Sequence, residues 1–273
     1  MKGSTVRGPS LKVEKLNTMT PKEYQNLTRQ ARAYYDSLIV NDVVQEFTTS
    51  PILNSNTKLQ KGDRANLGFE ATPATLATLE FNSCEAATSC KLTCLVFATM
   101  TAMFNSKSGK LCNTLKKRIR RLFLLLNATE FCVRKINLEI ESAALAGPVA
   151  VRLNVFTDIE WARYGINFDA PGVTFYDYTK VKSRAGRADY PIDITYSASE
   201  RDRVEDLLEV LRHSRVAMVF PGNTLPDEWN GFPVIDGDET DNRYLEPKGV
   251  IVGLRQKATQ HGKTENKFVN AFA

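Results

Sequence analysis

The sequence contains only two histidines, His213 and His261, and it has none of the short motifs that mark several large enzyme classes. A Walker phosphate-binding loop, a Gly-x-Gly-x-x-Gly dinucleotide turn and a Gly-x-Ser-x-Gly nucleophile turn are all absent. The two histidines are not spaced for a zinc-protease or rolling-circle nickase motif, and they are too few for most catalytic triads. These absences exclude the most familiar hydrolase and nucleotide-binding classes.

Long apolar runs and a strong charge bias are also missing. No run approaches the roughly eighteen apolar residues of a transmembrane helix, and the first residues lack the apolar stretch of a secretion signal. We therefore expect a cytoplasmic protein without membrane association. The formal net charge of +5 permits nucleic-acid binding but does not require it. The five cysteines are odd in number and clustered, which fits a metal or thiol role in a reducing cytosol better than a disulfide framework.

Two regions are expected: an N-terminal arm with a helix, residues 1–45, and an α/β domain, residues 46–273. Thr20 and Pro21 fit the N-cap and first turn of a helix that extends to about Val40. Residues 47–74 have no clean period and are expected to be irregular. Further helices are expected over 113–126, 128–145 and 199–213, and strands over 75–81, 149–155, 173–177, 192–196, 216–220, 233–236 and 249–254.

Strands that alternate with helices predict a parallel sheet. About seven strands favour a (β/α) barrel-like fold, a partial or irregular TIM-type barrel with an N-terminal helical extension. Polar residues follow the C-terminal ends of most expected strands, where parallel α/β folds carry their functional sites. The candidates expected to bind substrate or cofactor at these ends are Arg152, Asn154, Asp158, Ser197, Asp236 and Asp238.

Three further residues at one strand end carry the candidate catalytic chemistry. Asp177, Tyr178 and Lys180 combine an acid, a phenol and an amine, which suits general acid–base catalysis. The alternative is an aromatic strand with a solvated tip. Arg152 lies inside an apolar strand, where an unpaired charge is costly. It either clamps a carboxylate or phosphate of a ligand or forms a buried ion pair that fixes the strand.

The cysteine loop is the strongest pointer to a cofactor. Cys84, Cys90 and Cys94 lie within eleven residues, directly after the expected strand 75–81. Three thiolates leave one coordination position open, which favours an iron–sulfur cluster of the four-iron, four-sulfur type with one exposed iron. The alternatives are a structural zinc, with Cys112 or Cys132 able to supply a fourth thiolate, and thiols that bind no metal.

A basic run over residues 116–121 falls on the expected helix 113–126. Such a run is usually a solvated helix face. The alternative is a surface that contacts nucleic-acid phosphates.

Several segments, taken together and in order, resemble the gene product 88 family of phages and plasmids over roughly residues 50–270. They are the cysteine loop, Val151–Trp161, Phe175–Lys180, Val234–Arg243 and Gly249–Leu254. The resemblance implies a bacteriophage or mobile-element protein in the cytoplasm of a bacterial host.

The cysteine loop also resembles that of radical S-adenosylmethionine enzymes, in which the open iron binds the methionine part of that cofactor. It differs in having five and three residues between its cysteines. That superfamily has three and two, together with a glycine-rich motif after the second strand, where Asn154–Asp158 stands in this chain.

These observations predict an iron–sulfur enzyme, of the radical S-adenosylmethionine type by the second resemblance. Its substrate would be a nucleotide, a nucleic acid or a small metabolite. The alternative is a nucleic-acid-binding phage replication or host-takeover protein with zinc or no metal. The sequence leaves the reaction and the oligomeric state open.

Overall fold

The computed structural model describes residues 21–55, 64–88, 90, 94, 104–105 and 110–255, so residues 1–20 of the expected N-terminal region and His261 lie outside the described residues. The helices are α1 Pro21–Asp36, α2 Val40–Thr49, α4 Asn113–Asn127, α5 Thr129–Ala144, α6 Lys182–Ala185 and α7 Val204–Leu211, with short 3-10 helices η3 Trp161–Arg163 and η4 Arg243–Leu245. The strands are β1 Ala65–Gly68, β2 Phe104–Asn105, β3 Lys110–Leu111, β4 Val149–Arg152, β5 Val173–Thr179, β6 Asp193–Ser197, β7 Arg215–Phe220, β8 Glu228–Trp229, β9 Phe232–Asp236 and β10 Ile251–Arg255.

One sheet organises the molecule. Its eight strands follow the order β1-β4-β5-β6-β7-β10-β9-β8, and every neighbouring pair is parallel except β8 with β9. The described strands form a sheet with two ends, and β1 does not pair with β8. The mixed α/β fold is therefore confirmed. Closure into a TIM-type barrel is not shown in the described part of the chain.

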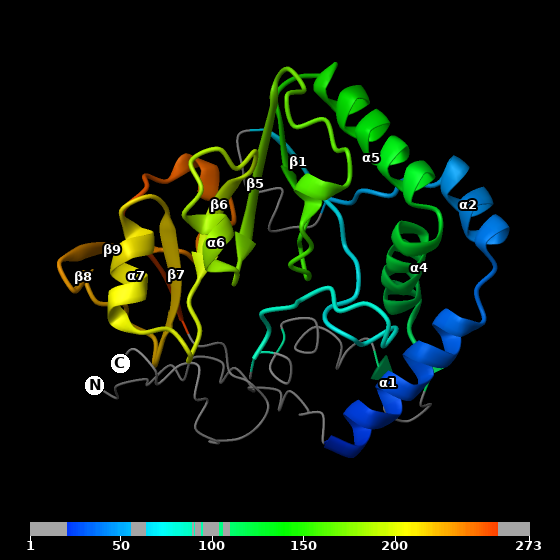
Figure 1. Ribbon diagram of the computed structural model, residues 1–273, viewed down its shortest axis with the longest axis horizontal. Helices are drawn as coiled ribbons and strands as arrows, with labels where there is room; N and C mark the ends of the chain where they lie inside the picture. Colours follow the sequence, from blue (N-terminus) through cyan, green and yellow to red (C-terminus); the bar gives the residue numbers. More distant parts are fainter. Residues whose placement is uncertain are drawn as a thin grey trace, which may run out of the picture.

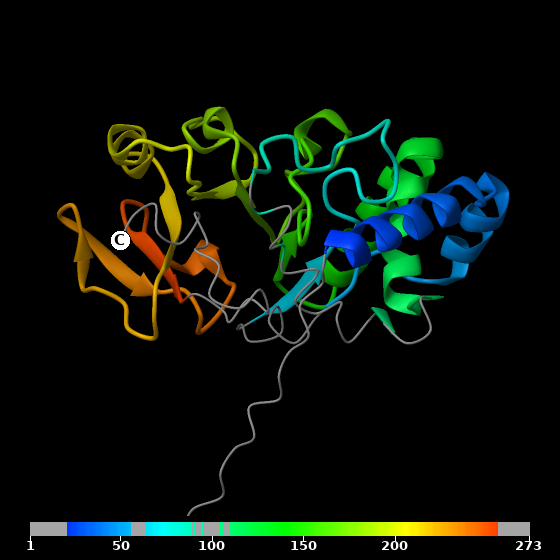
Figure 2. The ribbon, with the colours of Figure 1, turned by 90° about the horizontal axis from the view of Figure 1, so that it is seen from below.

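Helices cover one face of this sheet. Helices α6 and α7 lie over β6 and β7. Helices α1, α2, α4 and α5 pack together beside β1 and β4 (Figure 1). Turned by 90°, the molecule shows the yellow α7 on one side of the strands (Figure 2). Apolar residues three or four positions apart explain this packing: α4 buries Leu115, Ile119 and Leu122 in the main core. Within the described residues no helix is both long and apolar enough to cross a bilayer.

The segment that follows β9 crosses part of the sheet's other face. The side-chain amide of Asn66 on β1 donates to Asn242 Oδ1 at 3.2 Å, and the rings of Tyr176 and Tyr244 meet edge to face at 5.1 Å. Asn66 and Tyr176 are buried beneath these contacts. Residues from the far end of the sheet are thereby brought to β1, β4 and β5.

Six of the seven expected strands are confirmed with small shifts at their ends. The seventh, 75–81, is wrong: the segment is a series of turns and bends in which Leu76 is buried and Leu79 is exposed. The alternation of apolar and polar residues imitates a strand, but the chain turns at residues 74–77 and bends again at 79–80, and Ala74, directly before the segment, has a positive φ of 48°. The first strand is instead β1, whose Asn and Gly residues have little strand preference.

Helix boundaries also differ from expectation. The single N-terminal helix is two helices, because α1 ends at Asp36 and α2 begins at Val40. The helix expected from Ser199 begins at Val204, since the Ser199 N–H donates to Asp202 at 2.7 Å and holds a turn there. The hairpin between β8 and β9 was not anticipated. Its Asn230-Gly231 pair has positive φ at both residues, the signature of a two-residue hairpin turn.

Candidate functional site

The loop that follows β4 is organised by the side chain of Asn154. Its Oδ1 accepts hydrogen bonds from Thr157 Oγ1 at 2.8 Å, from the Ile159 N–H at 2.8 Å and from Trp161 Nε1 at 3.1 Å. Its amide group donates to the Ile159 carbonyl at 3.0 Å. The Asn154 side chain is thus occupied within its own loop and positions the residues that follow, including Asp158.

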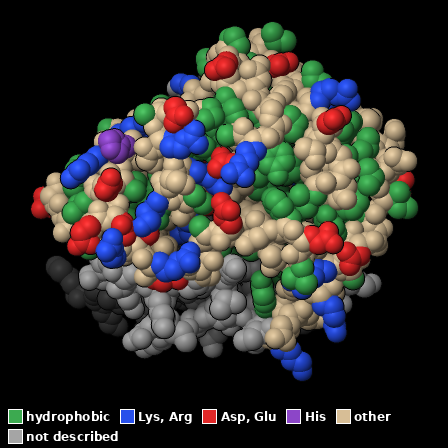
Figure 3. Space-filling model, in the orientation of Figure 1, with side chains coloured by type: hydrophobic (Ala, Val, Ile, Leu, Met, Phe, Trp, Pro, Cys, Tyr) green, Lys and Arg blue, Asp and Glu red, His purple; other side chains and the backbone are tan. Residues whose placement is uncertain are grey.

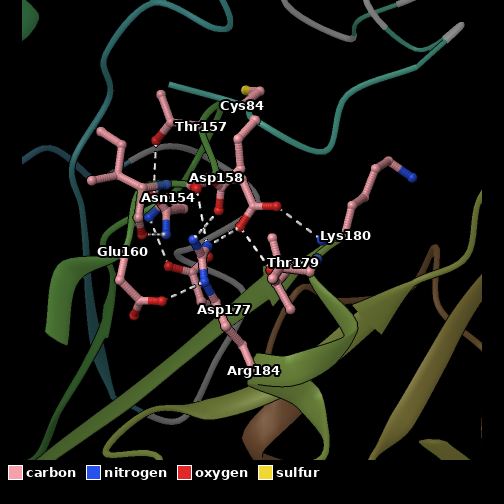
Figure 4. A network of polar contacts seen from close by, with 12 residues as sticks. Cys84, Asn154, Thr157, Asp158, Glu160, Asp177, Thr179, Lys180 and Arg184 are labelled. Atoms are coloured by element: carbon pink, nitrogen blue, oxygen red, sulfur yellow. Dashed lines mark hydrogen bonds and ion pairs between the residues drawn. The ribbon is translucent and has the colours of Figure 1, made fainter. Parts of the chain in front are cut away.

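Asp158 and Arg184 form the centre of a charged network at the carboxyl ends of β4 and β5 (Figure 4). Arg184 NH1 lies 2.7 Å from Asp158 Oδ1, and its other nitrogens bind Glu160 at 2.7 Å and Glu85 at 2.8 Å. Asp158 also accepts hydrogen bonds from Thr179 Oγ1 and from the Lys180 backbone N–H. Burial raises the pKa of Asp158, although these donors and Arg184 oppose the rise.

Lys180 directs its amine away from this network, toward the end of β6 (Figure 4). Nζ donates to Ser197 Oγ at 3.1 Å, to the Ser197 carbonyl at 3.2 Å and to the Ala198 carbonyl at 3.0 Å. Burial lowers the pKa of the Lys180 ammonium. The structure therefore brings together Lys180 and Ser197, two of the residues that the sequence nominated separately.

Asp177 and Arg152 meet where β4 and β5 run side by side. Asp177 is buried and accepts backbone hydrogen bonds from Asn154 at 2.8 Å and Tyr178 at 2.9 Å. Burial raises the pKa of its carboxyl group to about 7, and Arg152 opposes that rise. Arg152 lies 3.6 Å from Asp177, 3.7 Å from Asp241, and 4.6 Å above the Tyr178 ring.

The Arg152 guanidinium forms ion pairs with Asp177 and Asp241, but it makes no hydrogen bond to any described residue, and its buried Nε atom lies 3.6 Å from Asp177 Oδ1. A buried donor without an acceptor costs free energy and is uncommon in folded proteins. The guanidinium therefore retains hydrogen-bonding capacity for an anionic ligand beyond its two ion pairs. Burial raises the pKa of the nearby Tyr178 phenol to about 12, so Tyr178 stays neutral at physiological pH.

The first cysteine is held against the same edge of the sheet. The Asp158 N–H donates to the Ser83 carbonyl at 2.7 Å, and Cys84 Sγ lies 3.7 Å from the Phe156 carbonyl. Three residues distant in sequence bind the turn that follows: Arg184 on α6 binds Glu85, Arg201 binds the Ala86 carbonyl, and Glu200 binds Thr88. The start of the cysteine loop is thus anchored beside Asp158.

The cysteines have the right chemistry for a thiolate shell but are not gathered into one. All five are free thiols, so none is lost to a disulfide. Burial raises the pKa of Cys84 to about 11, with nearby Asp158 and Cys90 adding to the rise, so this thiol is protonated. Among the described residues no three His, Cys, Asp or Glu side chains stand in a metal-binding arrangement. The metal site on Cys84, Cys90 and Cys94 stays a prediction.

Asp236 and Asp238 lie on a different part of the sheet edge. Both bind Arg255: Asp236 Oδ2 is 2.8 Å from its NH2 atom, and Asp238 Oδ2 accepts its backbone N–H at 2.9 Å. Three strands, β6, β7 and β10, separate β9 from β5. Asp241, in the segment that follows β9, does contact the candidate site, because its Oδ2 lies 3.7 Å from Arg152 NH1.

The basic run on α4 is used inside the protein. Arg118 and Arg121 are buried: Arg118 binds Glu70 at 3.0 Å, and Arg121 donates to the Ile52 carbonyl at 2.7 Å. Arg120 pairs with Glu46 at 2.9 Å. On the face of the molecule seen in Figure 3, basic side chains are interspersed with acidic ones rather than collected in a patch. Both expectations for this run, a solvated face and a phosphate surface, are wrong for Arg118 and Arg121.

Arg184 was not among the site residues predicted from the sequence, although it binds three acidic residues of the site. Its position four residues after Lys180 is the only signal that places it near the strand end, and an arginine in a polar stretch usually indicates a solvated surface. Its role follows from three acids, Glu85, Asp158 and Glu160, that come from two other loops.

A family model described as gene product 88 matches residues 48–270, which is more than half of the chain. No curated protein gave a significant match, and no solved structure did either.

Proposed function

We propose that this chain, which belongs to the gene product 88 family, is an enzyme with its active site at the carboxyl edge of β4–β6. One observation carries the proposal: the cysteine loop is anchored beside a buried network of acids and cations at the edge where parallel α/β folds conduct chemistry. A purely structural ion pair would be expected to form hydrogen bonds, whereas Arg152 lies 3.6 and 3.7 Å from its two carboxylates and its buried Nε has no hydrogen-bond partner.

The chemistry of Arg152 indicates which class of substrate the site would bind. Its planar guanidinium is suited to a carboxylate or a phosphate, bound through two parallel hydrogen bonds. The substrate in this proposal is therefore an anionic small molecule, either a nucleotide or a metabolite that carries a carboxylate. Asp177 lies beside Arg152 with a pKa raised to about 7, and it can take up or release a proton near neutral pH. Lys180 and Ser197 form the adjoining polar wall.

The cofactor in this proposal is an iron–sulfur cluster on Cys84, Cys90 and Cys94. Such a cluster supplies one-electron chemistry, and a three-thiolate shell leaves one iron open, which is the position that S-adenosylmethionine would occupy. Because the described residues do not form a finished shell, binding would have to draw the three sulfurs together and deprotonate Cys84.

The test is anaerobic reconstitution of the full chain with iron and sulfide, followed by metal analysis and a visible absorption spectrum. We expect about four irons per chain, lost in Cys84→Ser, Cys90→Ser and Cys94→Ser. Cys112→Ser is the matched control: the Cys112 sulfur accepts a hydrogen bond from the Leu115 N–H and caps α4, and a serine hydroxyl caps helices well. Stoichiometric zinc, or no metal in the wild type, would overturn the cluster.

The nucleic-acid-binding alternative has less structural support, because Arg118 and Arg121 are committed to internal contacts. It predicts steeply salt-dependent binding to DNA or RNA. Metal-free protein that binds nucleic acid in this way would favour it over the enzyme.

A further inference from the structure

A cavity of about 740 Å³ opens at the opposite edge of the sheet from Cys84 and Lys180. Its walls come from the loop between α6 and β6, the turn between α7 and β7, and the residues that lead to β10. A volume of this order is typical of small-molecule sites. Arg184 is the one residue of the proposed active site that also lines this cavity.

The side chains around this cavity carry an excess of positive charge. Arg212, His213, Arg215 and Lys248 line it, together with Arg184 and Arg187, which pair with acids elsewhere. The lining carboxylates are already neutralised, since Asp193 pairs with Arg215 and Glu246 pairs with Arg243. The side chains of Arg212 and Lys248 are exposed and have no hydrogen-bond or ionic partner among the described residues.

Arg215 provides a rigid donor in the cavity wall. It is 2% exposed, Nε donates to Thr195 Oγ1 at 3.3 Å, NH1 donates to the Glu246 carbonyl at 2.8 Å, and NH2 pairs with Asp193. These contacts use three of the five N–H groups of the guanidinium and leave two for a ligand. A guanidinium fixed in this way contributes more binding free energy per hydrogen bond than a flexible side chain does, because it loses little side-chain entropy when a ligand binds.

We propose that this cavity binds the phosphate group of a small molecule, with Arg215, Arg212 and Lys248 as its anion contacts. Arg212 and Lys248 carry two positive charges that no described acid neutralises, and Arg215, whose charge is balanced by Asp193, adds fixed hydrogen-bond donors. Two net charges and several donors suit the charge and the oxygen atoms of a phosphate. Tyr190 and Tyr244 also line the cavity, and their rings would add apolar contact for a nucleoside or another ring attached to the phosphate. The proposal is independent of the iron–sulfur enzyme.

Calorimetric titration of the full chain with pyrophosphate and with ADP, at low ionic strength, tests this site. The double variant Arg212→Gln/Lys248→Gln should bind both probes at least about tenfold more weakly, because it loses two charge-assisted contacts. The control Lys117→Gln/Arg163→Gln removes the same charge from exposed side chains outside the cavity and should bind like the wild type.

The two probes also distinguish the source of the phosphate. Tighter binding of ADP than of pyrophosphate would point to a nucleoside phosphate, and equal binding to phosphate recognition alone. Failure of the wild type to bind either probe would overturn the proposal. Equal weakening in both double variants would do the same, because it would show only a long-range effect of net charge.

Discussion

The backbone N–H of Asn154 donates a 2.8 Å hydrogen bond to Oδ2 of Asp177. Asn154 follows β4 and Asp177 belongs to β5, so this contact continues the pairing of the two strands beyond the register that ends at Val151 and Phe175. The same carboxylate is buried and lies 3.6 Å from Arg152. Its protonation state therefore affects both the joined strand ends and the candidate anion-binding group.

The free energy of unfolding should depend on pH through Asp177. Burial raises the pKa of this carboxyl group to about 7, whereas an unfolded aspartate titrates near 3.9. Between these values the folded protein retains a proton that the unfolded chain releases. Stability from this group should therefore fall as pH rises, by at most about 1.4 kcal/mol per pH unit, and level off above about pH 7.

Urea denaturation of wild type and Asp177→Asn from pH 4.5 to 8 checks this dependence. The difference in unfolding free energy between the two proteins should change with pH in the stated direction. Asp189→Asn, at an exposed residue that pairs with Arg187, serves as the control and should not reproduce the change. Parallel profiles for wild type and Asp177→Asn would contradict a raised pKa.

Arg184→Ala should strongly destabilise the protein. Arg184 is 6% exposed as a side chain and binds Asp158, which is 10% exposed, together with Glu160 and Glu85. Removing it leaves a buried carboxylate without a counter-charge, which costs about 3 kcal/mol or more. Chemical denaturation measures the loss, and Arg187→Ala, which breaks an exposed pair, should cause no measurable change. A similar small effect for both variants would show that the Arg184 network contributes little to stability.

Asn154→Ala should loosen the loop that carries Asp158. The change leaves the indole N–H of Trp161 and the backbone N–H of Ile159 without acceptors in a buried setting, which costs at least about 2 kcal/mol. In a Trp229→Phe background, the fluorescence of Trp161 should shift to longer wavelength as water reaches the ring. Asn137→Ala, on α5, removes two exposed hydrogen bonds to Gly165 and Asn167 and should leave the spectrum unchanged.

In metal-free protein, Cys84 should react slowly with iodoacetamide. With a pKa raised to about 11, about one thousandth of the Cys84 thiol is ionised at pH 8, and thiolate is the reactive form. Peptide mass spectrometry should show labelling of Cys84 at least about 100-fold slower in native protein than in urea-unfolded protein. Comparable rates in the two states would mean that the thiol is neither buried nor held protonated.

Arg118→Ala should act on folding rather than on ligand binding. Arg118 is 5% exposed, binds Glu70 at 3.0 Å and stacks 4.1 Å from the Phe156 ring. Its removal leaves Glu70 buried and unpaired, at a cost of about 3 kcal/mol. The paired replacement Arg118→Met/Glu70→Leu should recover much of this loss. A nucleic-acid affinity that falls in Arg118→Ala without any loss of stability would contradict the internal role.

The local pattern of apolar and polar residues was sufficient to predict most of the helices and strands. The strands β4, β5, β6, β7, β9 and β10 are short, largely apolar runs, and α4 and α5 have apolar residues at helical spacing, so each could be predicted from its own residues. The strand predicted over 75–81 is wrong because alternation alone does not reveal the turns and bends that the chain makes there, after the positive φ of Ala74. Strand β1 was missed because its place is set by pairing with β4, not by its own composition.

The candidate site was partly predictable for the same reason. The carboxyl ends of parallel strands lie at one edge of the sheet. Asp158, Asp177 and Lys180 lie at or after the ends of neighbouring strands, so they are expected at the same edge. The sequence could not show that the Asn154 side chain serves its own loop, or that Arg184 binds acids from two other loops. Those assignments depend on which residues meet in space.

The amino-acid sequence by itself determined the α/β class, most strands and helices, and the edge of the sheet where polar residues collect, because these depend on periodicity and on strand direction. Tertiary structure decided that the sheet ends at β1 and β8, that Arg118 and Arg121 are internal, and that Arg152 pairs with Asp177 and Asp241 without a hydrogen bond to a described residue. The physical reason is that the free energy of a buried charge depends on its partners, and partners distant in sequence are fixed only when the chain has folded.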